Sequence, residues 1–128
     1  MIIIDENIVQ SQRDRLGALK IHFRQVGFEI GRRGMKDRND IIPLLHKLRR
    51  PTFFTCDQDY YEKALLHEGY CLVYLDVWPT EAAEYIRRFL GHRSFRTQAQ
   101  RMGKVVRVRR SGLSWWEMGA KTACTVSW

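Results

Sequence analysis

Carboxylates follow two predicted β-strands at the points where each strand ends. The chain opens with the run IIIDEN, in which Asp5 and Glu6 come directly after three β-branched residues. Later, Asp57 and Asp59 come directly after PTFFTC, residues 51–56. Short apolar runs that are closed by polar residues are typical of strands buried on both faces of a parallel sheet. If the two strands are neighbours, their terminal carboxylates meet at one edge of the sheet.

Such a cluster of carboxylates predicts a divalent cation. Ligands of open parallel sheets bind outside the carboxyl ends of the strands. Carboxylates crowded together there repel one another unless a cation lies between them. Mg²⁺ or Mn²⁺ is favoured, because hard divalent ions prefer carboxylate oxygens and water. Asp40, which precedes an apolar helix, is a further candidate. We therefore predict that Asp5, Asp40 and Asp57 are metal ligands, while helix capping is the alternative role for each of them.

The elements that must position these residues alternate between strand and helix. Strand-like runs lie at residues 2–4, 26–30, 51–56 and 70–77, and helix-like runs at 8–19, 41–48, 60–68 and 79–91. This repeated alternation predicts a three-layer α/β/α domain with a mainly parallel sheet. Residues 103–119 alternate basic and β-branched residues around a Ser-Gly turn, which predicts a C-terminal β-hairpin. We expect a core at residues 1–91, an extension at residues 92–128 packed on the same domain, and a loose tail from residue 120.

The basic charge of the chain is concentrated in its last third. Residues 1–86 carry 12 Lys and Arg against 13 Asp and Glu, whereas residues 87–128 carry 10 against the single acid Glu117. Such asymmetry indicates a polyanionic partner. The candidate nucleic-acid contacts are Lys104, Arg107, Arg109, Arg110, Trp115 and Trp116. The two tryptophans would stack on bases of a single strand, although aromatic residues in hairpins more often belong to the core.

Cysteine and hydropathy patterns exclude other classes of protein. Cys56, Cys71 and Cys124 contain no Cys-x-x-Cys pair, which argues against a disulfide framework and a zinc knuckle. No apolar run is long enough to cross a bilayer, and the short N-terminal run lacks a basic leader. We therefore expect a cytoplasmic protein without a membrane partner.

Three motifs, taken in order, resemble the PIN-like nucleases. They are IIIDEN, the segment GMKDRND before an apolar helix, and TFFTCDQDYY. They look like the compact subgroup with Asp-Glu-Asn after the first strand and a Thr-x-Asp-x-Asp-aromatic motif; VapC-type toxins are the better known relatives. The resemblance covers roughly residues 1–90. It implies a PIN-like α/β/α fold and a Mg²⁺- or Mn²⁺-dependent endoribonuclease that hydrolyses RNA phosphodiesters.

The resemblance also assigns roles by position. Asp5, Asp40, Asp57 and Asp59 match the catalytic acids, and Asp37 could take the place of Asp40. Glu6, Asn7, Asp37 and Asp76 would hold metal-bound waters or shape the surroundings of the site.

Partners and rival functions complete the prediction. The implied partners are single-stranded or structured RNA, an antitoxin protein if the chain is the toxin of a toxin-antitoxin pair, and a second copy of the chain. The alternative is a PIN-like module that binds RNA or protein without catalysis. Haloacid-dehalogenase-like phosphatases also place an Asp after the first strand, but Asn7 stands where they have a second Asp.

Overall fold

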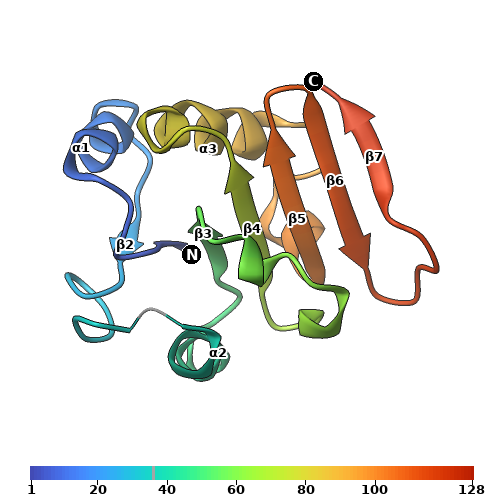
Figure 1. Ribbon diagram of the computed structural model, residues 1–128, viewed down its shortest axis with the longest axis horizontal. Coiled ribbons are helices and arrows are strands. Elements are labelled where there is room, and N and C mark those ends of the chain that lie inside the picture. The colour runs from blue at the N-terminus through green and yellow to red at the C-terminus, as the bar shows by residue number, and fades with distance from the viewer. Residues whose placement is uncertain (36) are drawn as a thin grey trace.

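The structure is a computed structural model that describes residues 1–35 and 37–128. Its strands form a seven-stranded sheet in the order β2-β1-β3-β4-β5-β6-β7 (Figure 1). Strand bounds are β1 (Ile2–Ile4), β2 (Arg24–Gln25), β3 (Thr52–Thr55), β4 (Cys71–Asp76), β5 (Lys104–Arg109), β6 (Gly112–Glu117) and β7 (Cys124–Ser127). Helix bounds are α1 (Gln10–Ala18), α2 (Arg38–Lys47), α3 (Ala82–Gly91) and α4 (Gln98–Arg101).

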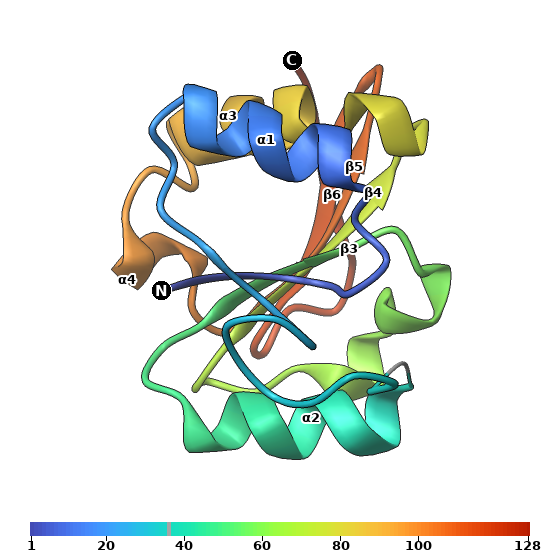
Figure 2. The same cartoon turned by 90° about the vertical axis from the view of Figure 1, so that its left-hand side faces the viewer.

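The first five strands are parallel to one another, and β6 and β7 are antiparallel additions. The parallel part has the order 2-1-3-4-5, which is one of the two common orders of doubly wound α/β sheets. The chain moves outward from β1 to β2 and then crosses back to β3 on the other side of β1. This reversal places α1 and α3 on one face of the sheet and α2 on the other (Figure 2). The predicted α/β class with a mainly parallel sheet is therefore confirmed.

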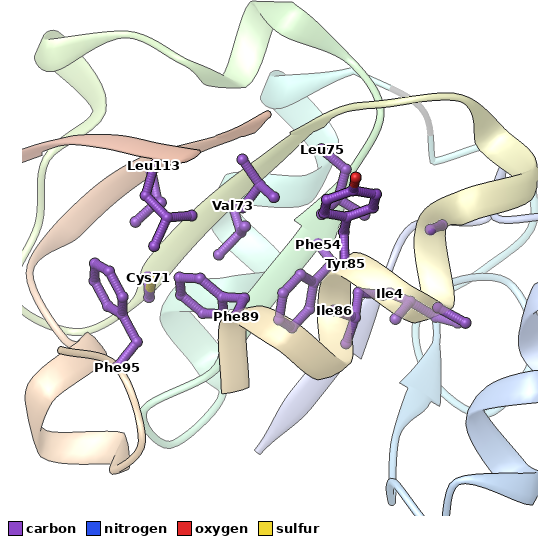
Figure 3. Close-up of a cluster of buried hydrophobic side chains, with 14 of the residues drawn as sticks. Ile4, Phe54, Cys71, Val73, Leu75, Tyr85, Ile86, Phe89, Phe95 and Leu113 are labelled. Atoms are coloured by element: carbon purple, nitrogen blue, oxygen red, sulfur yellow. The ribbon is translucent and has the colours of Figure 1, made fainter. Parts of the chain in front are cut away.

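Each central strand buries residues on both faces of the sheet, because successive side chains of a strand point to opposite sides. Ile4, Phe54 and Val73 pack with α1 and α3, and Figure 3 shows this cluster around Phe89 of α3. Ile3, Phe53 and Leu72 pack against α2 in a second core. Continuous apolar runs such as IIIDEN and TFFT are the sequence counterpart of this two-sided burial.

Three local predictions are wrong. The helix expected at residues 60–68 is replaced by two 3₁₀ turns, Gln58–Tyr60 and Lys63–Leu65. The Tyr60 side chain is fully buried, and its ring centroid lies 5.3 Å from that of Phe53. This packing fixes the chain at Tyr60. The strand expected at 26–30 forms at Arg24–Gln25. Only an isolated Val26–Ile30 bridge remains, since Gly27 adopts a φ of 85° and turns the chain.

The expected loose tail is the third error, because Cys124–Ser127 forms the edge strand β7 on β6. The hairpin of β5 and β6 is confirmed. Because β5 pairs with β4 along six residues, the segment 92–128 continues the same sheet. No helix in the described part of the chain is long and apolar enough to span a membrane.

Candidate acidic site at the carboxyl edge of the sheet

The carboxyl ends of β1 and β3 are direct neighbours. Ile4 is in register with Phe54, and the Asp5 N–H donates to the Phe54 carbonyl oxygen at 3.0 Å. Between these two strands the order of the sheet reverses, and such switch points form the crevice in which α/β sheets bind ligands. The condition under which Asp5 and Asp57 were expected to meet is therefore fulfilled.

Asp5 is buried with only half of its carboxylate satisfied. Its side chain is 3% exposed, and Oδ2 accepts a hydrogen bond from the Thr55 hydroxyl at 2.7 Å. Oδ1 is buried and has no hydrogen-bond partner. Burial raises the pKa of Asp5, and the charge of Asp57 raises it further, whereas the Thr55 hydroxyl and the Glu6 and Asn7 amides act in the opposite direction. The ionised form is therefore stabilised by the Thr55 hydroxyl and the two amides, while Oδ1 has no hydrogen-bond partner among the described residues.

The hydroxyl of Tyr60 marks where the surrounding carboxylates converge. This hydroxyl is also buried without a partner. Burial raises the pKa of Tyr60, and the negative charges of Asp5, Asp57 and Asp37 raise it further. Asp37, at the start of α2, is thus one of the acids whose charge acts on the Tyr60 hydroxyl. Asp37 caps α2, because its Oδ1 accepts from the Asp40 N–H at 3.2 Å.

Asp57 is held by the turn that follows β3. Its N–H donates to the Thr55 hydroxyl oxygen at 3.0 Å, and its Oδ1 accepts from the Asp59 N–H at 2.9 Å. Thr55 therefore connects the two acids, since its hydroxyl accepts from the Asp57 backbone while donating to Asp5. Asp59 is exposed, and its carbonyl oxygen accepts from Arg38 at 3.1 Å. Asp59 thus acts in the turn through its backbone, with its side chain facing solvent.

The remaining predicted site residues have other partners. Asp40 lies 3.8 Å from Arg32 in an ion pair. Glu6 Oε2 accepts from the Gly34 N–H at 2.9 Å, which ties the β2–α2 connection to the end of β1. Asn7 is exposed. Asp76, at the end of β4, is paired with Arg107 at 2.6 Å.

The structure therefore brings Asp5 and Asp57 together through Thr55, and leaves Asp40 and Asp76 in separate ion pairs. Within residues 1–35 and 37–128, no group of three or more His, Cys, Asp and Glu side chains is arranged to hold a metal. Mg²⁺ usually keeps several waters and is bound through one or two carboxylates together with substrate phosphates. The unpartnered Oδ1 of Asp5 and the adjacent Asp57 fit this smaller type of site.

The predicted nucleic-acid residues are largely engaged within the protein. Arg107 pairs with Asp76, and Arg110 pairs with Glu81 at 2.7 Å. Trp115 is buried, with its ring 5.0 Å from that of Phe95, so it belongs to the core. The expectation that Trp115 stacks on bases therefore conflicts with its burial.

The other three predicted contacts are partly buried. Lys104 donates to the Gln100 carbonyl oxygen. The Trp116 ring lies under the Lys63 ammonium group at 5.0 Å. Arg109 has a buried Nε without a hydrogen-bond partner. None of the three presents a fully exposed side chain for a phosphate or a base.

Sequence reasoning missed one exposed aromatic residue at this edge. Trp78 is the second residue after β4 and is 64% exposed. It lines a hollow of about 350 Å³ together with Asp76, Val77 and Arg110. The available signal was a large apolar residue placed between a strand end and the Pro-Thr start of a helix, where no core position is expected.

Comparison with known proteins gives no match: no family model fits the chain, and no curated protein or solved structure is significantly similar to it.

Proposed function

We propose that the protein is a Mg²⁺- or Mn²⁺-dependent ribonuclease of PIN-like type, with its site at the carboxyl ends of β1 and β3. The observation that carries the proposal is the buried, unpartnered Oδ1 of Asp5 beside Asp57. A buried carboxylate oxygen without a donor is costly, and a coordinated cation would remove that cost. The motif resemblance points to the same two residues.

Asp5 and Asp57 would hold the ion, and Asp37 is the third candidate because its charge reaches the same centre. When bound, such an ion lowers the pKa of a coordinated water and neutralises charge that builds on phosphate oxygens. Thr55 positions both acids, since its hydroxyl contacts the Asp5 side chain and the Asp57 backbone. Arg38 extends from the start of α2 toward Asp59 and Glu62. Arg38 is paired with Glu62 at 2.7 Å, so it would contact a phosphate beside the acids by exchanging this partner.

The exposed Trp78 supports a single-stranded substrate. It follows β4, the strand next to β3, at the same edge as the acids. Stacking of an unpaired base on an exposed aromatic ring tolerates any sequence and is common in proteins that bind single strands. In this proposal the scissile phosphate lies over Asp5 and Asp57 while a neighbouring base stacks on Trp78.

The test is cleavage of a labelled single-stranded RNA with Mg²⁺, with Mn²⁺ and with EDTA. Asp57→Asn should lower the rate by about 100-fold, because loss of a group that only supports a metal ligand already costs about 10–100-fold and Asp57 is proposed as a ligand itself. Asp14→Asn is the matched control, because Asp14 is an exposed carboxylate on α1. Cleavage that persists in EDTA, or that is equal in the wild type and Asp57→Asn, would overturn the proposed site.

A non-catalytic RNA-binding module is the second candidate. It is favoured by the small number of convergent ligands, since no three-ligand group occurs in the part of the chain that the structure describes. Wild-type protein that binds the RNA but leaves it intact with either metal would establish this second function and refute the nuclease.

A further inference from the structure

Four arginines from distant parts of the sequence meet at the opposite edge of the sheet. Arg49 and Arg50 precede β3, and Arg93 and Arg96 follow α3. We call these four the amino-edge arginines, because they lie where the parallel strands begin. Figure 2 shows this side of the molecule at its left, where α4 lies near the N-terminus and the helices α1, α2 and α3 end.

Specific hydrogen bonds join the two segments. Gln98 Nε2 donates to the Arg50 carbonyl oxygen at 2.8 Å, and Gln100 Nε2 donates to that of Arg93 at 2.9 Å. Both glutamines belong to α4, which therefore contacts the chain before β3 through one side chain and the loop after α3 through the other. The Gln98–Arg50 hydrogen bond is a tertiary contact between segments that are far apart in the sequence.

The buried side chain of Arg101 connects the two segments that carry the amino-edge arginines. It is 7% exposed, and its guanidinium group donates to the Thr52 hydroxyl at 2.9 Å and to the Phe95 and Arg96 carbonyl oxygens at 3.0 and 3.3 Å. One buried side chain thus links the start of β3 to the loop after α3. The amino-edge arginines are consequently fixed by their backbones while their side chains remain exposed.

The amino-edge arginines also lack acidic partners. All are exposed, and none takes part in an ion pair among residues 1–35 and 37–128. In contrast, Arg87 and Arg88 on α3 pair with Glu84. Arg96 makes one contact of its own, from Nε to the Gly91 carbonyl oxygen at 3.2 Å. Exposed arginines without ion-pair partners in the described part of the chain, on two segments that both contact α4, produce a positive potential that attracts polyanions.

The backbone at Arg50 adds an independent observation. Arg50 has a φ of 51°, in the left-handed region that residues with a Cβ rarely adopt. Glycine or asparagine would meet the same turn at lower cost. Local strain of this kind is commonly found at functional positions. The sequence therefore places a charged side chain where the backbone geometry alone does not favour it.

We propose that the amino-edge arginines bind the phosphate backbone of RNA, on the edge of the sheet opposite Asp5 and Asp57. The planar guanidinium fork matches two phosphate oxygens, and all four residues are arginines. Anionic lipid surfaces attract lysine and arginine alike and favour a basic helix with an apolar face. Here the arginines stand on loops beside α4, whose sequence is QAQR. The inference uses none of the acidic residues and does not depend on the nuclease proposal.

The test is the affinity for a labelled oligouridine, measured by fluorescence anisotropy in EDTA over a range of salt concentrations. The double variant Arg49→Gln/Arg96→Gln should bind about 10-fold more weakly, and the slope of log K against log salt should become shallower by roughly 1.4, as expected for two lost contacts to a single strand. Arg87→Gln/Arg88→Gln removes the same charge from α3 and is the matched control. It should change neither quantity beyond a small general effect.

Equal losses in the two double variants would overturn the proposal, because the effect would then be net charge alone. Preferential binding to vesicles that contain anionic lipid would also overturn it. Thermal melts of both variants establish that each is folded before binding is compared. Because the assay contains no metal, Asp57→Asn should bind like the wild type. A wild type that binds without cleaving would sink the nuclease proposal while leaving this inference in place.

Discussion

Replacing Asp5 by Asn should stabilise the metal-free protein. Asn retains a carbonyl oxygen that can accept the Thr55 hydroxyl, and it removes a negative charge that is 3% exposed and unpartnered at Oδ1. Asn still places a polar atom at the buried Oδ1 position, but that atom is neutral, and an unpartnered charged group costs more than an unpartnered neutral one. We expect the free energy of unfolding at neutral pH to rise by about 1 kcal/mol, which corresponds to roughly 4 °C in Tm.

The pH dependence gives this prediction its sign. Burial raises the pKa of Asp5 above its usual value of 3.8, so the folded protein binds this proton more tightly than the unfolded chain does. The free energy of unfolding of the wild type therefore falls as the pH rises from about 3.8 through the raised pKa. Asp5→Asn lacks this contribution. The two proteins should be equally stable at low pH and diverge as Asp5 ionises.

Urea denaturation in EDTA from acid to neutral pH measures the difference directly. Adding Mg²⁺ then supplies the second half of the assay. Saturating metal at 100 times its Kd should stabilise the wild type by about 2.7 kcal/mol and leave Asp5→Asn unchanged. Asp14→Asn, an exposed carboxylate on α1, should follow the wild type in both halves. An Asp5→Asn protein that is less stable than the wild type in EDTA at neutral pH would refute the reasoning, as would a wild type that Mg²⁺ does not stabilise.

Two further substitutions test the surroundings of the site and the added strands. Thr55→Val removes the hydroxyl that donates to Asp5 and accepts from the Asp57 N–H. It should therefore lower the free energy of unfolding, measured in urea, by about 1–3 kcal/mol. Thr55→Ser keeps a hydroxyl and should retain most of the stability. Gly112→Ala would place a Cβ 2.1 Å from the Val126 carbonyl oxygen. Strand β7 should therefore separate from β6, and the amide hydrogens of β7 should exchange with solvent faster. Gly17→Ala is the control, because a Cβ there would have no atom within 4 Å, and it should leave this exchange unchanged.

The elements that could be predicted from sequence are those in which local pattern and burial agree. Ile2–Ile4, Thr52–Thr55 and Cys71–Asp76 are short, continuous apolar strands because both faces of the sheet are covered there. The segment after Asp57 has a helical composition, yet the tertiary demand to bury Tyr60 decides its structure. Strand β7 carries weak signal of its own and forms because β6 offers it an edge.

The acidic site was predictable only in part, for the same reason. Asp5 and Asp57 could be found because strand ends are visible in the sequence, and a parallel sheet brings such ends together. The choice between Asp37 and Asp40 could not be made, since both begin the same helix. The structure makes Asp37 the cap of this helix, and the charge of Asp37 also acts on the Tyr60 hydroxyl. The exposed Trp78 is similarly decided by where β4 ends.

The number of basic residues in a segment of the sequence does not predict where the surface of the folded protein is positively charged. The last third of the chain holds 10 basic residues, but Arg107, Arg110 and Arg87 are neutralised by acids that come from the first two thirds or from α3. The positive surface that remains is assembled from both parts, because Arg49 and Arg50 join the loop after α3 at the amino edge. The sheet thus carries exposed arginines at one edge and, at the other, an acid pair in which Asp5 is buried and Asp57 is half-buried. A polyanion attracted to the molecule would meet the amino edge first, and only a cation between Asp5 and Asp57 would let a phosphate approach the carboxyl edge.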